Sequence, residues 1–589
     1  MRRLLVTLAV TSLAAGLAAP LDAAPRTLWP GVTYERGVQF TPRGPVAINV
    51  LRGPRPGGLT TLEPVLSNET IVGRETLTSM QRRLAPGATA AGVNGDYFTL
   101  ATGRPSGVLM RDGELLNPPN GRRASVGITT DGALDVRRVS LAGTWRTGIQ
   151  ARPLGALNQP PGADGVALYT QAYGAATPAS PGAFAVILFP FPAVTPDVEL
   201  FAPVVEAVPA ATPVTIPFGG AVLLARGSSA PTLQAEAPAG ATATVRLALR
   251  PTWPGVVSAI GGGPQIVRAG APVFSAGEAF TTRQLGPAAP RTGVGQLRDG
   301  RIVLVAVDGR QAGYSVGLTN FELAQALVRL GAVTGMALDS GGSTTMAFDG
   351  SVLNRPSEGR ERPVSTALML MYRGVFALEP PARVSPNGDG VAESPDLRYR
   401  LARPSSVTVA LRGPDGSTPV ATTAEQTPGT YPVRFPGADT AVEADTAVEA
   451  LAAAAPGEWT FEVKAVDDLG RTSSMARTFV VDDTLGFLRV PRRLAVPPAG
   501  RSIRVSFRFF RPARAFVTVH DAAGRVVRRG LAPSGTLEAG DHDVTWDGLG
   551  EGRRRLTGAF TVRVVARSSL GVSQLDAPIA LRLAVAPRG

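Results

Sequence analysis

The chain contains no cysteine. Disulfide bonds, thiolate metal sites and cysteine nucleophiles are therefore all excluded, and stability has to come from the size of the hydrophobic core. Histidine is almost as rare, since only His520 and His542 occur, both near the C-terminal end. A Ser-His-Asp triad or a histidine-bound zinc ion is thus excluded within the first 375 residues. Chemistry there has to use carboxylates, arginines, hydroxyls, amides or a metal ion bound through oxygen.

Lysine occurs once, at Lys464, so arginine carries nearly all of the positive charge behind the net charge of +13. The sequence has no dense basic run with interleaved aromatic residues and no nucleic-acid-binding motif, and we therefore expect no nucleic-acid partner. The charge is compatible with attraction to anionic cell-envelope polymers or phosphorylated glycans.

A long apolar run occurs only at the N-terminus. Arg2 and Arg3 precede the apolar stretch Leu4 to Leu17, and small residues follow near Ala18 or Ala23, which predicts a secretory signal peptide over residues 1–23. The run is shorter than the ~20 residues that a membrane-spanning helix needs. We therefore expect a protein that is secreted or located at the cell envelope, with no transmembrane segment after signal cleavage.

The length of 589 residues is too great for one hydrophobic core and indicates three or four domains. The 68 glycines and 52 prolines, without a low-complexity repeat, favour many short strands and turns. Changes in composition predict a first domain over residues 30–375, strand-rich between 131 and 250, and β-sandwich modules over 380–483 and 488–589. We expect an α+β first domain, with helices on a mixed sheet, followed by two immunoglobulin-like β-sandwich modules.

The clearest helix signal is a capping box at Thr319-Asn320-Phe321-Glu322. Phe321, Ala324, Leu327 and Val328 are predicted to line its buried face, and Gly331 to end it.

Strands are predicted on both sides of this helix, over residues 302–307 and 332–338. Asp308 and Asp339 follow directly after them. In α/β folds, polar residues just beyond strand ends are where binding and catalytic sites lie.

Short polar loops recur along the first domain. They are Asn94 to Phe98, Arg291 to Gly295, Asp308 to Ser315, Asp339 to Thr345 and Asn354 to Arg362. Each loop alone is weak evidence for a site, because Asp-Gly and Asn-Gly are ordinary turn dipeptides.

The order of the motifs is more specific. They are Gly261-Gly262-Gly263-Pro264, Arg291-Thr292-Gly293-Val294-Gly295, Val307-Asp308-Gly309-Arg310, Ser315-Val316-Gly317, Leu338-Asp339-Ser340-Gly341-Gly342-Ser343-Thr344-Thr345-Met346 and Asn354-Arg355-Pro356-Ser357. In this order they resemble the phosphodiester glycosidase family, and the resemblance covers roughly residues 40–375. Ser340 stands where the family usually has another glycine. The resemblance implies an enzyme that cleaves a glycosidic bond to a phosphodiester.

Such a substrate carries one negative charge on phosphorus and needs an anion clamp. Arg291 is the first candidate, because a guanidinium binds phosphate oxygens bidentately. Further donors are predicted from hydroxyls, side chains and glycine amides around the same loops. These candidates for substrate or phosphate binding are Thr292, Asn94, Arg310, Ser315, Gly341, Gly342, Ser343, Thr344 and Arg362, and an Arg362–Glu361 surface ion pair is an equal alternative for Arg362.

Cleavage of a glycosidic bond uses carboxylates near the anomeric carbon. Asp308, Asp339 and Asp96 are the candidates, and the sequence does not assign nucleophile and base among them. A divalent cation, Ca²⁺ or Mg²⁺, held by these aspartates is a further hypothesis, because the site would be made of oxygen ligands. The alternative is that Asp308 and Asp339 are turn and cap residues that stabilise the fold.

Residues beyond 380 resemble the immunoglobulin-like domain of flagellar hook-capping proteins. The matching residues are Ser385 to Gly390, Asp521 to Gly524 and Trp546-Asp547-Gly548. The preferred function for the whole chain is an exported glycosidase acting on a sugar-1-phosphodiester in a phosphorylated glycan or envelope polymer. The alternative is a non-catalytic surface protein that binds glycan or envelope material.

Overall fold

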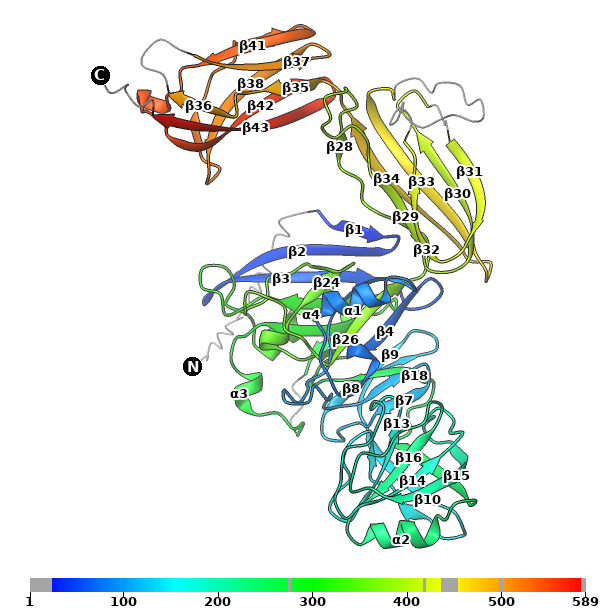
Figure 1. Cartoon of the computed structure of the whole chain (residues 1–589). Helices are drawn as coiled ribbons and strands as arrows, with labels where there is room; N and C mark the ends of the chain where they lie inside the picture. Colours follow the sequence, from blue (N-terminus) through cyan, green and yellow to red (C-terminus); the bar gives the residue numbers. More distant parts are fainter. Residues whose placement is uncertain (1–23, 274–276, 417–419, 436–453, 497–501, 584–589) are drawn as a thin grey trace, which may run out of the picture. The chain divides into compact units, whose positions relative to one another are not determined.

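A computed structural model describes residues 24–273, 277–416, 420–435, 454–496 and 502–583, so the expected signal peptide lies outside the described residues. The chain divides into two compact units, Met1–Arg373 (unit 1) and Gly374–Gly589 (unit 2) (Figure 1). Within the described residues, no helix is both long and apolar enough to cross a membrane.

The expected α+β class is wrong. Half of the residues lie in strands and 7% in helices, with four α-helices in the described part of the chain. The four are α1 (Leu77–Leu84), α2 (Ser229–Glu236), α3 (Thr282–Leu285) and α4 (Asn320–Arg329). The one strong helix signal in the sequence therefore led to the wrong class, because the core of the chain is made almost entirely of packed sheets.

The largest sheet that carries the site, here called the central sheet, has eight strands. Their order is β1 (Arg26–Trp29), β2 (Val32–Thr41), β3 (Gly44–Gly53), β22 (Ile302–Val307), β21 (Arg291–Leu297), β23 (Ala332–Ala337), β19 (Gln265–Arg268) and β20 (Ala271–Pro272). Every neighbouring pair is antiparallel, so the expected mixed sheet is not formed. As expected, all six residues of β22 are buried.

Helix α4 begins at the predicted capping box, in which Thr319 and Glu322 each accept from the other's backbone N–H. Leu323, Ala324 and Leu327 face the core, whereas Phe321 is 50% exposed and the expectation for it was wrong. Because helical neighbours on one face are three or four apart, Leu323 and Leu327 define the buried stripe and Phe321 falls outside it.

A second sheet packs beside α1 and supplies the loop after Asn94. Its order is β25 (Ser351–Val352), β24 (Met346–Phe348), β5 (Thr89–Asn94), β26 (Thr366–Tyr372) and β4 (Thr60–Leu66). A third sheet has the order β7 (Glu114–Asn117), β6 (Leu109–Arg111), β18 (Val256–Gly261), β8 (Ala124–Thr129) and β9 (Leu134–Arg138).

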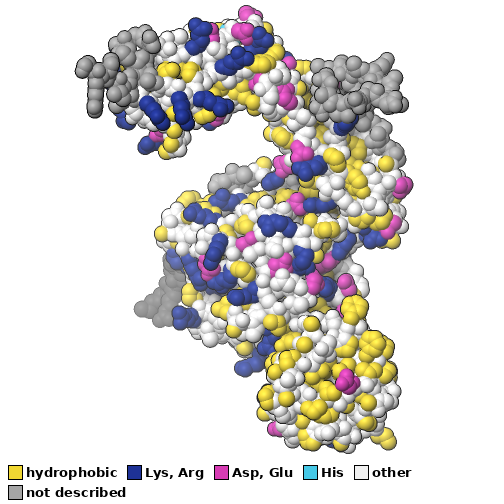
Figure 2. All heavy atoms as spheres, viewed as in Figure 1, with side chains coloured by type: hydrophobic (Ala, Val, Ile, Leu, Met, Phe, Trp, Pro, Cys, Tyr) yellow, Lys and Arg dark blue, Asp and Glu magenta, His cyan; other side chains and the backbone are white. Residues whose placement is uncertain are grey.

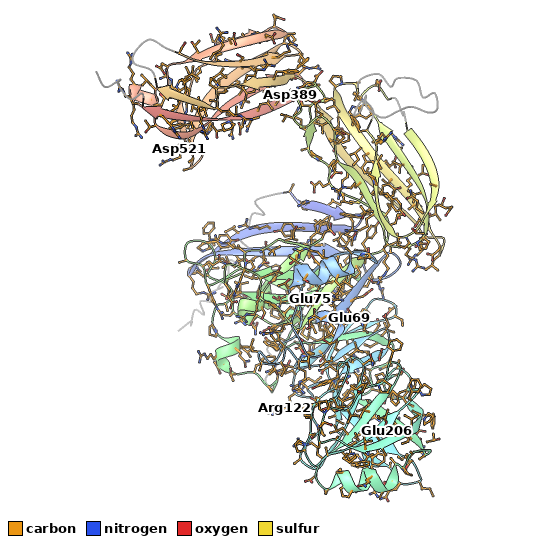
Figure 3. All side chains as sticks on the ribbon, in the orientation of Figure 1. Glu69, Glu75, Arg122, Glu206, Asp389 and Asp521 are labelled. Carbon is orange, nitrogen blue, oxygen red and sulfur yellow. The ribbon has the colours of Figure 1, made fainter. Side chains whose placement is uncertain are left out.

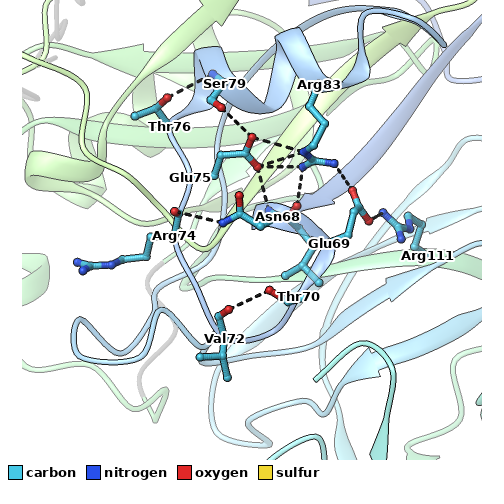
Figure 4. A network of polar contacts seen from close by, with 11 residues as sticks. Asn68, Glu69, Thr70, Val72, Arg74, Glu75, Thr76, Ser79, Arg83 and Arg111 are labelled. Carbon is cyan, nitrogen blue, oxygen red and sulfur yellow. Dashed lines mark hydrogen bonds and ion pairs between the residues drawn. The ribbon is translucent and has the colours of Figure 1, made fainter. Parts of the chain in front are cut away.

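The N-terminal end of α1 is fixed by an ion-pair network (Figure 4). Glu75 accepts from Arg83 and from the backbone N–H of Asn68, and Arg83 also bonds Glu69, which pairs with Arg111. Because Glu75 is buried and multiply bonded, the network stabilises the connection between β4 and α1 more than an exposed pair would.

The strand-rich part expected between residues 131 and 250 folds as an eight-stranded lobe. Its order is β11 (Arg152–Pro153), β10 (Ser140–Arg146), β17 (Thr242–Arg250), β15 (Glu199–Pro209), β14 (Phe184–Leu188), β16 (Ala221–Ala225), β13 (Val166–Thr170) and β12 (Ala156–Leu157). Figure 2 shows apolar side chains covering much of the visible face of this lobe, and Phe201, Val205 and Phe218 are exposed.

Unit 2 contains two β-sandwiches. The first pairs the sheet β27 (Phe376–Ala377), β29 (Leu397–Leu401), β32 (Gly429–Val433) with the sheet β28 (Arg383–Val384), β34 (Thr472–Val481), β33 (Gly457–Asp467), β30 (Ser405–Arg412), β31 (Val420–Gln426). The second pairs β35 (Leu485–Arg489), β37 (Ile503–Phe509), β41 (Gly540–Trp546) with β36 (Arg493–Val496), β43 (Gly571–Leu583), β42 (Gly558–Ser568), β38 (Ala513–Asp521), β39 (Val526–Arg528), with β40 (Thr536–Leu537) on β38.

The aspartates of two turns in unit 2, Asp389 and Asp521, have structural roles (Figure 3). Asp389 accepts from the backbone N–H groups of Val391 and Phe487, and Asp521 accepts from those of Ala523 and Arg525. Both aspartates therefore act as turn residues that hold the chain between strands.

The sheets predict where unit 1 can be cut from unit 2. Strand β26 ends at Tyr372 within unit 1, whereas Phe376 in β27 pairs with Arg400 of unit 2. We expect a fragment of residues 24–373 to unfold cooperatively, and a longer fragment ending at Leu378 to aggregate more because it exposes Phe376. Calorimetry and light scattering of both fragments check this. A non-cooperative melt for residues 24–373 would contradict the boundary.

Candidate active site

Three strands of the central sheet bring predicted site residues to one edge. Strand β21 is paired antiparallel with both β22 and β23, so it starts where they end: Arg291 lies opposite Val307, and Gly293 opposite Ala337. The loops that begin at Asp308 and Asp339 therefore leave the same edge, with Arg291 at the start of the strand between them. Asp308 follows β22 and Asp339 follows β23. In the sheet these two strands are separated by β21, and along the chain helix α4 connects them.

The second sheet adds Asp96 to the Asp339 side of this edge. The backbone N–H of Asp339 donates to the carbonyl of Gly95 at 2.9 Å, and Gly95 itself is bonded to Thr366. Asp96 is 2% exposed, with its Oδ2 accepting from the backbone N–H of Gly107 at 2.6 Å. The Asp339 backbone is thus bonded to the residue just before Asp96, and the charge of Asp339 acts on the Asp96 carboxyl; these two residues are here called the carboxylate pair.

Burial sets the protonation of this pair. The pKa of Asp96 is raised to about 7, mainly because the carboxyl is removed from water; the Gly107 N–H opposes the rise and the charge of Asp339 adds to it. Burial also raises the pKa of Asp339 to about 6, although Ser343, the Ser340 N–H and two arginines favour its ionised form. Near neutral pH, Asp339 is therefore mostly ionised while Asp96 keeps a proton for part of the time.

An aromatic and cationic wall stands beside the pair. The Arg123 guanidinium lies 5.1 Å from the centre of the Tyr97 ring and 4.3 Å from that of Phe280. Burial and the nearby Asp339 charge raise the pKa of the Tyr97 hydroxyl, so it stays a neutral donor. Sequence reasoning missed Arg123 and Phe280, because no local motif marks them and only the fold brings them to Tyr97.

Asn94 lies beneath the site and is fully buried. Its Nδ2 donates to the Asp339 carbonyl at 2.8 Å, and its Oδ1 accepts from the Thr292 hydroxyl at 2.8 Å and the Thr345 N–H at 3.1 Å. The Thr344 hydroxyl is 3.3 Å from that of Thr292. Asn94, Thr292 and Thr344 are therefore brought together, as a buried network that positions the Asp339 loop.

Arg291 lies at the expected edge, but its guanidinium is 2% exposed and engaged with backbone carbonyls. It donates to Leu318 at 2.9 Å, Gln284 at 2.9 Å and Pro287 at 2.7 Å. Burial lowers its pKa. The side chain anchors the segment around α3, and its donors are occupied by the protein itself.

Ser340 has extended backbone angles, φ −127° and ψ −178°, which any residue adopts. Its hydroxyl accepts from Arg291 at 3.5 Å. Serine in place of the family's usual glycine is therefore accommodated without strain at this position.

Asp308 is buried and saturated with donors. Its carboxylate accepts from Asn354 at 2.8 Å, Tyr314 at 2.8 Å and the Arg355 N–H at 3.1 Å, and its carbonyl accepts from Ser315 at 2.6 Å. Burial raises its pKa, and these donors oppose the rise. Asn354 in turn accepts from the backbone N–H of Met346 just after the Asp339 loop. Asp308, which Ser315 and Asn354 bond, therefore helps to position that loop.

The turn after Asp339 is flanked by two arginines. Gly341 has φ 70°, and a β-carbon there would come within 3.2 Å of the Arg310 guanidinium. At Gly342 a β-carbon would clash with Arg362, which pairs with Glu358. Both glycines therefore leave room for cations beside the carboxylate pair. Arg310 is exposed and has no acidic partner among the described residues.

Arg362 does not pair with Glu361, whose carboxylate instead bonds the N–H of Thr78 at the start of α1. Of the two alternatives left open for Arg362, the ion pair therefore forms with Glu358, four residues earlier, and a role in substrate binding stays a prediction. The Ser343 hydroxyl lies close enough to Asp339 to lower its pKa, but within the described part of the chain it has no partner with the geometry of a hydrogen bond.

Within the described residues, no three acidic or histidine side chains gather as a metal-binding group. Asp308 accepts from amide and phenol donors, and Asp96 from a backbone N–H. A Ca²⁺ or Mg²⁺ ion held by the three aspartates stays a prediction from the sequence.

The two strand-end aspartates should respond oppositely to loss of charge. In Asp308→Asn, an amide group would face several donors, so we expect the free energy of unfolding to fall by about 2–4 kcal/mol. In Asp339→Asn, which removes a costly partly buried charge, we expect little change or a gain. Urea unfolding of both variants checks this, and equal destabilisation would contradict the separate roles.

The raised pKa of Asp96 predicts how stability depends on pH. The unfolded carboxyl ionises near pH 4, whereas the folded one ionises near 7, so its contribution to stability falls as pH rises between these values. We expect Asp96→Asn to reduce the loss of unfolding free energy between pH 5 and pH 8 by on the order of 1–3 kcal/mol. Asp112→Asn, in an exposed turn, is the matched control. The same pH dependence in all three proteins would show that Asp96 is not buried as an acid.

Comparisons with known proteins locate two families in the chain. Residues 208–371 match the sequence model of the phosphodiester glycosidases, and residues 499–569 match that of the FlgD Ig-like domain. The first match includes Asp308 and Asp339 but not Asp96 or Asn94.

Relatives match the chain only in part. An SPbeta prophage-derived uncharacterized protein of Bacillus subtilis (strain 168), YomE, is 36% identical over 83 residues, 14% of this chain and 13% of its own length. A hypothetical protein from Synechocystis of known structure is 24% identical, with TM-score 0.49, over 58% of this chain and 62% of its own.

The catalytic domain of zebrafish N-acetylglucosamine-1-phosphodiester alpha-N-acetylglucosaminidase, auto-inhibited by its pro-peptide, is 16% identical, with TM-score 0.33. The match covers 60% of this chain and 87% of that domain. The resemblance seen in the sequence is confirmed for two segments: a phosphodiester glycosidase match in unit 1 and a FlgD Ig-like match in unit 2.

Proposed function

We propose that unit 1 hydrolyses the glycosidic bond of a sugar-1-phosphodiester. The observation that carries the proposal is the carboxylate pair, Asp96 and Asp339, whose pKa values are raised to about 7 and about 6. Two carboxyls that differ in protonation can act as acid and base in one glycosidic cleavage. The phosphodiester glycosidase match contains Asp339 and its loop.

The proposed reaction breaks the bond between the anomeric carbon and the bridging oxygen. Asp96 gives its proton to the departing phosphate oxygen, water adds to the anomeric carbon, and Asp339 accepts the proton that the water loses. The negative charge of Asp339 also stabilises the positive charge that develops on the sugar. Because a phosphate monoester leaves readily, the proton from Asp96 contributes less than it would for a sugar leaving group.

The charges around the pair suit an anionic substrate. Arg123 and Arg362 both stabilise the ionised form of Asp339, and Arg310 lies beside Gly341 on the same loop. We assign the phosphate clamp to Arg310 with Arg362, because the donors of Arg291 are already bonded to carbonyls. A protonated Asp96 also avoids a second negative charge facing the diester.

The sequence supports a substrate outside the cytoplasm. The predicted signal peptide fits an exported enzyme, and the net positive charge fits attraction to a phosphorylated glycan or envelope polymer. The two sandwiches of unit 2 would then provide spacing or attachment.

Sugar 1-(4-nitrophenyl phosphate) diesters of several hexoses and N-acetylhexosamines test the proposal. We expect release of free sugar and 4-nitrophenyl phosphate, which becomes coloured only after a phosphatase is added. In ¹⁸O-labelled water, the label should appear in the sugar. Direct release of 4-nitrophenol, or label in the phosphate, would instead show cleavage at phosphorus and contradict the proposal.

The Asp339→Asn variant gives the matching prediction for the mechanism. We expect kcat/KM to fall by about a thousand-fold or more, because the charge that stabilises the transition state is lost while the shape is kept. Asp112→Asn, the exposed control, should keep the parent rate. Activity of Asp339→Asn within a few-fold of the parent would exclude Asp339 from the chemistry.

A further inference from the structure

A polar cavity of about 340 Å³ lies in unit 1 beside the loop that holds Asp96. Its polar lining includes Arg104, Ser106, Asn117, Asn120 and Gln159. Pockets of this size accept a small molecule such as one sugar unit, and a lining rich in amides and hydroxyls favours a hydroxyl-bearing ligand over an apolar one. The proposed reaction uses none of these residues.

Arg104 gives the cavity a positive charge. Its Nη1 donates to Gln159 Oε1 at 2.8 Å, and no carboxylate within the described ranges forms an ion pair with it. Gln159 is neutral, so the guanidinium keeps its full charge and further N–H donors. A cation held in this way at the wall of a polar cavity favours an anionic group.

Asn117 adds an acceptor that lacks a partner. The side chain is 3% exposed, and its Nδ2 donates to the carbonyl of Gly107 at 2.6 Å. Its Oδ1 is buried, and no donor among the described residues forms a hydrogen bond with it. Buried acceptors are rarely left unsatisfied, and a ligand hydroxyl in the cavity would supply the missing donor.

The cavity is linked to the carboxylate pair through one residue. The carbonyl of Gly107 accepts from Asn117, and the N–H of Gly107 donates to Asp96. Ser106, which lines the cavity, also bonds through its N–H to the carbonyl of Tyr97 at 2.8 Å. The segment at residues 105–107 therefore both lines the cavity and bonds to the proposed acid.

We propose that this cavity is a subsite for a second phosphorylated sugar of the substrate, with the phosphate on Arg104 and a hydroxyl on Asn117. The inference rests on the proposed function and extends it. The substrate is then a chain with repeated sugar phosphate units, and the enzyme holds one unit in the cavity while it cleaves at its neighbour.

Binding to the full chain tests the subsite without catalysis. Glucose 6-phosphate and N-acetylglucosamine 6-phosphate are titrated calorimetrically, with inorganic phosphate and glucose as separate arms. We expect a sugar phosphate to bind more tightly than either arm, Arg104→Gln to weaken it at least tenfold, and Arg104→Lys to restore part of the affinity. Arg298→Gln, at an exposed turn on the opposite end of β21, should leave binding unchanged.

Several outcomes of the titration would overturn the subsite. These are no binding of either sugar phosphate, equal affinity for inorganic phosphate, or a loss of binding in Arg310→Gln but not in Arg104→Gln. The last result would place the ligand at the Asp339 loop instead.

Kinetics separate the subsite from the proposed function. Two diesters are compared, identical except that one carries a further phosphate on its aglycone sugar. We expect the extended diester to have at least tenfold higher kcat/KM, and Arg104→Gln to remove this advantage while hydrolysis of the short diester stays unchanged. Equal rates for both diesters in the parent would overturn the subsite. If neither diester is hydrolysed, the proposed function fails, and the titration still decides whether the cavity binds a sugar phosphate.

Discussion

The buried side chain of Asn94 is the interaction on which the site depends. One amide group joins the end of β5 to the Asp339 carbonyl, to Thr292 in β21 and to the backbone before β24. These contacts come from sequence positions up to about 250 residues apart; those to Thr292 and Thr345 are buried, and the one to Asp339 is partly buried. A buried amide with its donors and acceptors satisfied fixes geometry strongly, because any shift leaves a polar group unpaired.

The hydrogen bonds of Asn94 also determine the electrostatics of the carboxylate pair. Asn94 and the Gly95–Asp339 backbone bond hold the loops after two different sheets together, so Asp96 and Asp339 cannot move apart to reduce their repulsion. Burial makes ionisation of both costly, and the pair settles at different protonation states. Holding two buried carboxyls together costs folding free energy, and such perturbed groups are the kind that the proposed proton transfer needs.

The sequence predicted local features well and tertiary ones poorly. The capping box at Thr319, the buried strand β22 and the polar loops after β22 and β23 follow from short-range patterns. The same patterns misled the fold class: β22 and β23 do run parallel to each other, but antiparallel β21 lies between them, so no two neighbouring strands of the central sheet are parallel. Residue type also could not show that the polar groups of Arg291 and Asp308 form hydrogen bonds within the protein, because their partners lie on distant loops. Arg123 and Phe280 carry no motif at all.

Whether an arginine can bind an anionic ligand depends on the groups that already surround its guanidinium. Arg291 is desolvated, and carbonyl oxygens replace its water, so its charge is neutralised by dipoles within the fold. Arg310 and Arg104 keep their charge available, one beside the Asp339 loop and the other at the cavity behind Asp96. A substrate with a single phosphate would use only the first. A second cation without an acidic partner among the described residues, at the polar cavity, is what a chain of repeated phosphates would require, because each additional anionic group needs its own charge partner when it leaves water.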